Sequence, residues 1–95
     1  MEEGEDYVVR PAGLVVRRLR HERGWPPREL IAAIGEASYR ASGQHETITP
    51  NLLAGIEERN EPVPYDTLCL VAAGLGCDPV DILRALDGHR RTEFE

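Results

Sequence analysis

The stretch of residues 48–68, ITPNLLAGIEERNEPVPYDTL, constrains the fold more than any other part of the chain. Thr49 followed by Pro50 is typical of a helix start, because threonine caps free amide groups and proline at the first helical position lacks one. Leu53 and Ile56 give this helix a buried face. The two prolines of the sequence EPVP then forbid a helix. The stretch therefore predicts a short capped helix, a turn and the start of another helix.

Two more helices are expected upstream. In residues 10–23, Val16 and Leu19 share one apolar face while the arginines point away from it. Gly24 is typical of a helix end, and Trp25 is expected to enter the core. The sequence GWPPREL then begins a second helix, because proline is tolerated in a first turn.

The second helix has two candidate ends. It could stop at Gly35, or it could continue and stop at Gly43. The spacing of Ala37, Ser38 and Ala41 is helical, which favours the longer helix.

Downstream, residues 65–76 have the apolar spacing of a fourth helix, and residues 80–86 that of a short fifth helix with Asp78 as its cap. No segment requires a strand. We therefore predict one all-α domain of five helices over residues 10–86, preceded by an acidic flexible leader (residues 1–9) and followed by a polar tail (residues 87–95).

The formal net charge of −6 is unevenly distributed along the chain. Residues 10–40 hold seven arginines against three glutamates, whereas the segments on either side are acidic. A negative total argues against indiscriminate DNA binding, but the basic segment leaves room for a local DNA footprint. The same arginines can also be read as solvated helix surfaces.

Three pieces of sequence occur in an order that resembles the lambda repressor/Cro-like (Xre) family of helix-turn-helix DNA-binding domains. They are LRHERGWPPREL, GIEERNEPVPYDTL and LVAAGLGCDPVDIL, and the resemblance covers about residues 13–86. It implies a five-helix fold whose second and third helices form the motif, in a bacterial regulator of transcription. It also implies a partly buried ion pair between Arg20 and Glu57 that joins the first helix to the third.

The chain departs from the family pattern around the third helix. Family members present polar side chains to the bases there, whereas the matching positions here are Pro50, Asn51, Leu52 and Gly55. Asn51 alone can make the bidentate contact that adenine offers. About twelve extra residues, EASYRASGQHET, also separate the second helix from the third if the second ends at Gly35. We expect this polar insertion to supply contacts that the third helix lacks; the alternative is a solvated loop.

These features support two functions. The first is a sequence-specific transcription regulator that binds double-stranded DNA as a homodimer on a palindromic site. Its contacts with phosphates and bases are expected from Arg17, Arg28, Arg40, Gln44, His45, Thr47, Thr49, Asn51 and Arg59. The second is a protein-interaction module, adaptor or antitoxin-like, that keeps the fold with weak or no DNA binding. Its partner surface would be Leu52, Leu70 and Ala73.

We expect no enzyme activity, no metal and no cofactor. The three histidines are scattered, Cys69 and Cys77 lack the spacing of a zinc site, and no nucleophile motif or phosphate-binding glycine loop occurs. Both cysteines lie in apolar contexts, which favours buried thiols. No apolar run approaches the length of a membrane span and no signal peptide is present, so the sequence is typical of a cytoplasmic protein.

Overall fold

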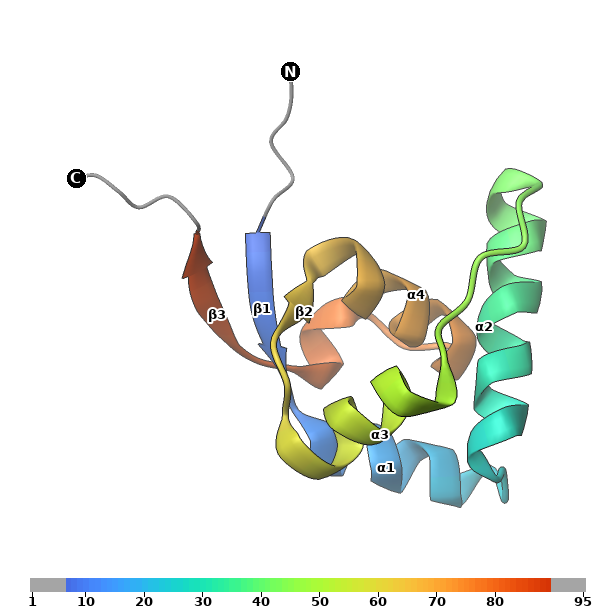
Figure 1. Ribbon diagram of the computed structural model, residues 1–95. Helices are drawn as coiled ribbons and strands as arrows, with labels where there is room; N and C mark the ends of the chain where they lie inside the picture. The colour runs from blue at the N-terminus through green and yellow to red at the C-terminus, as the bar shows by residue number, and fades with distance from the viewer. Residues whose placement is uncertain (1–6, 90–95) are drawn as a thin grey trace.

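The computed structural model describes residues 7–89, with side chains for residues 7–85, and contains four helices and three strands in that range (Figure 1). In chain order the elements are β1 (Tyr7–Pro11), α1 (Gly13–Glu22), α2 (Pro27–Ser42), α3 (Pro50–Arg59), β2 (Val63–Pro64), α4 (Tyr65–Leu75), the 3-10 turn η1 (Pro79–Ile82) and β3 (Leu83–His89). The strands lie on one side in Figure 1 and α2 on the other. None of the helices described has the length and apolar character needed to cross a membrane.

The all-α expectation is wrong, because the two ends of the domain pair with each other. The three strands form an antiparallel sheet in the order β2-β1-β3, in which Val9 of β1 lies opposite both Val63 and Leu86. Residues 83–86, expected in a fifth helix, belong to β3. Residues 7–9 and 87–89, expected in the leader and the tail, also lie in strands, as do residues 10–11, expected at the start of the first helix. The rest of the expected leader and tail lies outside the described residues.

The physical reason for this difference is tertiary. The sequence of β3, LRALDGH, contains good helix formers. These residues nevertheless form a strand, because their backbone pairs with β1. Val9 and Pro11 of β1 are buried, and strand propensity depends on such packing more than on the backbone alone. A five-residue strand beside an acidic terminus has too little periodicity to be recognised locally.

The predictions for the central helices are confirmed. Helix α2 continues past Gly35 and ends at Gly43, whose φ of 80° is the left-handed conformation that glycine adopts without strain. Helix α3 begins after Thr49, as expected. Trp25 is half-buried and packs against the core. The buried apolar side chains of the core are Val9, Val16, Leu30, Ile34, Ile48, Leu53, Ile56, Val63, Leu68, Val71, Ala72, Leu75 and Ile82.

Asn60 connects the end of α3 to two other elements. Its own φ of 50° ends α3, and its side-chain Oδ1 accepts a hydrogen bond of 2.8 Å from the backbone N–H of Gly13. Its carbonyl oxygen accepts a bond of 3.1 Å from Arg10 Nη1. Because α1 has no side-chain cap of its own, Asn60 satisfies an amide of its first turn and holds α1 against α3.

Candidate nucleic-acid interface

The first turn of α3 faces outward. The Thr49 side-chain oxygen accepts a hydrogen bond of 3.1 Å from the Leu52 N–H, which caps the helix. Thr49, Pro50 and Asn51 are exposed, while Leu53 is buried on the opposite side of the helix. The core therefore fixes the helix by its inner face and leaves the amide of Asn51 accessible at the end that helix-turn-helix proteins direct at bases.

The middle of the outward face of α3 is occupied by the side chains of Arg59, the last residue of the helix, and Glu61, which follows it. A Cβ atom at Gly55 would lie 2.3 Å from Glu61 Oε1 and 3.2 Å from Arg59 Nη2. Glu61 and Arg59 are themselves joined by a bond of 3.0 Å from Nε to Oε2, and their side chains are 45% and 57% exposed. Gly55 is buried because this pair covers it. The surface at position 55 is therefore formed by the polar groups of Arg59 and Glu61.

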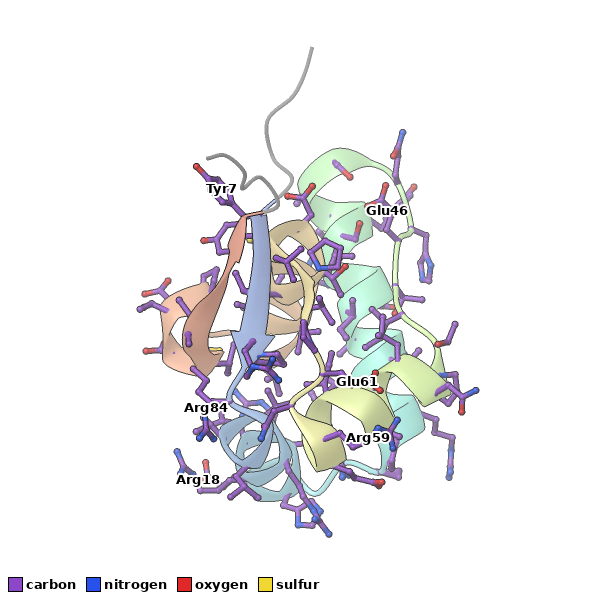
Figure 2. The ribbon with its side chains drawn as sticks, turned by 60° about the vertical axis from the view of Figure 1, so that its left-hand side comes forward. Tyr7, Arg18, Glu46, Arg59, Glu61 and Arg84 are labelled. Atoms are coloured by element: carbon purple, nitrogen blue, oxygen red, sulfur yellow. The ribbon has the colours of Figure 1, made fainter. Side chains whose placement is uncertain are left out.

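Exposed arginines gather on α1 and the first turn of α2. Arg17 and Arg28 are exposed, and neither forms a hydrogen bond or ion pair with another described residue. Arg18 is held only by a 3.7 Å contact with an acid one turn further along α1. Arg18 and Arg59 lie toward one end of the molecule and Glu46 toward the other (Figure 2). The charges of Arg17 and Arg28, which no described acid neutralises, would suit a polyanion such as DNA.

Arg20 and Glu57 form the buried ion pair that the family resemblance implies. Arg20 donates from Nε to Glu57 Oε2 at 2.7 Å and from Nη2 to Oε1 at 2.9 Å, and its Nη1 donates to the Trp25 carbonyl at 2.8 Å. The hydrogen bond to Glu57 raises the pKa of Arg20 above its ordinary value, so the guanidinium stays charged. The pair joins α1 to α3 and is too buried to contact a ligand.

The polar insertion is folded against α2. Residues 36–42 are the last two turns of α2, and residues 43–49, which we call the return segment, run back beside that helix to α3 (Figure 1). Arg40 is exposed at the far end of α2 and lies 3.6 Å from Glu36, a contact too long and exposed to immobilise it. The insertion is therefore neither a loose loop nor part of α3.

Hydrogen bonds fasten the return segment to α2. The buried Ser38 hydroxyl donates to the Gln44 carbonyl at 2.7 Å and accepts from the Glu46 N–H at 3.3 Å. The Thr47 hydroxyl donates to the Ile31 carbonyl at 2.6 Å. These bonds use Thr47 internally, whereas the Gln44 side chain stays exposed.

His45 lies over α2 at a glycine. A Cβ atom at Gly35 would lie 2.2 Å from His45 Cε1, so the imidazole occupies the space that glycine leaves free. This explains why a glycine is found inside a long helix, where it costs about 1 kcal/mol relative to alanine. The four insertion residues expected to contact DNA, Arg40, Gln44, His45 and Thr47, are all exposed, but the side chains of His45 and Thr47 also contact α2.

We predict that Ser38→Ala lowers the free energy of unfolding by about 1–2 kcal/mol, because two backbone partners lose their bond to a buried hydroxyl. It should also speed proteolytic cleavage within residues 43–49, measured by limited proteolysis and urea denaturation. The matched control is Ser42→Ala, because Ser42 is exposed and water can replace its bonds to Ser38 and Gln44. Equal losses in the two variants would contradict the fastening role of Ser38.

The expected partner surface is only partly available. Leu52 and Leu70 are half-buried and pack against the core, whereas Ala73 is exposed. Next to Ala73 in sequence, Gly74 helps to line an open hollow of about 380 Å³. Its other lining residues include Trp25, Glu29, Glu36 and Arg40.

Neither cysteine belongs to a metal-binding cluster among the described residues. Cys69 and Cys77 are both free thiols and half-buried. Burial raises the pKa of Cys77, and nearby Asp81 adds to this, so the protonated thiol is favoured at neutral pH. In the part of the chain that the structure describes, no three His, Cys, Asp or Glu side chains are grouped to hold a metal ion.

The sequence did not point to Glu61 as a member of this face. The charges of residues 58–61, ERNE, come close to neutral, but the left-handed Asn60 turns the chain back over α3. A glycine on the outward face followed six residues later by a glutamate was the only local signal. No protein-family model, curated protein or solved structure matches the chain.

Proposed function

We propose that the chain is a DNA-binding regulator of transcription, similar to the lambda repressor/Cro-like family, that lays α3 in the major groove. The observation that carries the proposal is the outward first turn of α3, with exposed Thr49 and Asn51 on a helix that is fixed from behind by the core. An asparagine amide in that position matches the donor and acceptor of adenine.

The sequence-independent part of the affinity would come from Arg17 and Arg28. Both are exposed without a described partner, so binding to phosphate would cost them no existing ion pair. Arg40 is a weaker candidate, because Glu36 lies 3.6 Å away and would stand close to the same phosphate.

The proposal includes a two-fold dimer working in the cytoplasm. Two copies on a palindromic site would place their α3 helices in major grooves one turn of DNA apart, about 34 Å. Pairing is expected because one protomer offers few base-reading groups, and doubling them raises discrimination between sites.

The proposal predicts a steep dependence of DNA affinity on salt. Duplexes selected from a random pool should bind with log K falling linearly against log salt, and Arg28→Ala should reduce the slope by about 0.9 per protomer. Fluorescence anisotropy measures this. The control is Arg84→Ala on β3, which removes an equal charge at an exposed residue that is not among the proposed phosphate contacts and should leave the slope nearly unchanged. Failure of the wild type to enrich or bind any duplex would reject DNA binding.

The hollow beside α2 supports a second candidate, a protein-interaction module. Its lining combines an aromatic side chain, Trp25, with charged residues, a mixture found at protein interfaces. A partner bound there would dissociate less readily at high salt than DNA does, so the salt titration also separates the two functions.

A further inference from the structure

Gly55 on the outward face of α3 leaves a space that two other side chains fill. The Glu61 carboxylate, with Oε1 at 2.3 Å and Cδ at 2.8 Å from the position of a Cβ at residue 55, stands where a side chain of that residue would begin. Arg59 Nη2 lies at 3.2 Å from the same point. Helix periodicity puts Asn51, Gly55 and Arg59 on one face, so the pair continues the line that begins at Asn51.

The backbone holds Glu61 in this place. Asn60 adopts a φ of 50°, and the Glu61 N–H donates to the Gly55 carbonyl at 3.2 Å, which folds the chain back over the last turn of α3. Figure 2 shows Arg59 and Glu61 close together at α3. The position of the carboxylate is thus set by the end of the helix and not by a free loop.

The pair leaves hydrogen-bonding groups unused. Arg59 Nε donates to Glu61 Oε2 at 3.0 Å, so its terminal nitrogens remain as donors, while Oε1 accepts no bond from any described residue. A phosphate would gain little here, because the carboxylate cancels the charge of the guanidinium. A C·G base pair presents the complementary pattern in the major groove: two acceptors on guanine and an amino donor on cytosine.

We infer that Arg59 and Glu61 read a C·G pair as one unit, with Arg59 donating to guanine O6 and N7 and Glu61 Oε1 accepting from cytosine N4. This inference rests on the proposed DNA-binding function. It adds to Asn51 a second base-specific contact, about two turns further along α3. It also explains the glycine at position 55, where any larger residue would displace the carboxylate.

The test is selection of duplexes from a random pool with the wild type, Glu61→Gln and Glu58→Gln. Glu58 is the matched control, because it is an exposed glutamate of α3, three residues before Glu61, and its replacement removes the same charge. We expect Glu61→Gln to lose the cytosine preference at one position, by roughly 5- to 150-fold, with adenine gaining there because glutamine pairs with it. Glu58→Gln should select the wild-type motif.

A second variant guards against a purely structural effect. Gly55→Ala keeps both charges but pushes the carboxylate aside, so it should lose the same preference while circular dichroism shows an intact fold. If Glu61→Gln and Gly55→Ala enrich the wild-type motif, Arg59 and Glu61 only stabilise the end of α3 and the inference is wrong. The proposed DNA binding would not be affected by that result. If the wild type enriches no motif, the proposed function fails and this inference fails with it.

Discussion

Glu57→Ala is expected to lower the free energy of unfolding by about 3–5 kcal/mol, enough to leave a domain of this size largely unfolded at 37 °C. The substitution strands the Arg20 guanidinium, whose side chain is only 8% exposed. Two of the hydrogen bonds of Arg20 end on Glu57, at 2.7 and 2.9 Å, and only the bond to the Trp25 carbonyl would remain. The cost is the desolvation of an unpaired charge more than the loss of the attraction itself.

Urea denaturation of three variants tests this account. Glu22→Ala removes the acid of an exposed ion pair on α1, in which Arg18 and Glu22 are 3.7 Å apart and both side chains are about 60% exposed. This variant should lower the free energy of unfolding by at most about 0.5 kcal/mol. Replacing both members of the buried pair, as in Arg20→Met with Glu57→Leu, should recover much of the stability lost by Glu57→Ala. A Glu57→Ala loss no larger than that of Glu22→Ala would refute the burial argument.

The stabilisation from Arg20 should not respond to pH in the physiological range. Its pKa is raised by Glu57, so the folded state binds this proton more tightly than the unfolded state does. The contribution is therefore fully present below the ordinary arginine pKa and is lost only as pH rises through the higher folded value, in strong alkali.

Gly13→Ala should lower the free energy of unfolding by about 2 kcal/mol or more, because α1 meets α3 at a point with no room for a methyl group. A Cβ atom there would lie 2.2 Å from the Ile56 carbonyl oxygen, 2.9 Å from that of Glu57 and 2.7 Å from Asn60 Oδ1. Two of these neighbours are backbone atoms of α3, which can move only if the two helices separate. The same movement would break the cap that Asn60 provides to α1.

Gly43→Ala is the control for Gly13→Ala, measured by thermal and urea denaturation together. Gly43 has a φ of 80° and open space where a Cβ would lie. Alanine at this position therefore meets no clash, and the left-handed conformation alone should lower the free energy of unfolding by about 1–2 kcal/mol. Gly13 lies inside α1 and carries no such strain. If Gly13→Ala were less destabilising than Gly43→Ala, close packing of α1 on α3 could not be the reason for glycine at position 13.

Local signals in the sequence were sufficient for most of the helices. Thr49, Gly43 and the apolar spacing of α4 act within one or two turns, and each could be read from residue type and position. The link between Arg20 and Glu57 came from family resemblance, since 37 positions separate them and no local rule joins them.

For the candidate interface, the structure shows the exposure of the predicted residues and one feature that was not predicted. Thr49, Asn51, Arg17 and Arg28 are exposed, in agreement with the surface role expected of them. The recognition face was expected to be apolar at position 55, but Glu61 supplies its polar group from outside the helix. Helical periodicity describes residues within a helix and says nothing of a chain that turns back over it.

The amino-acid sequence by itself determined where the four helices lie, because caps, prolines, glycines and apolar spacing act over a few residues. Only the tertiary structure decided the sheet, the path of residues 43–49 and the placing of Glu61 over Gly55. In each of these, backbone or side-chain groups find their partners across a distance in the chain: β1 pairs with β3, Thr47 bonds to Ile31, and a carboxylate fills the space left by a glycine. Such partners are chosen by packing of the whole domain, which no local pattern records.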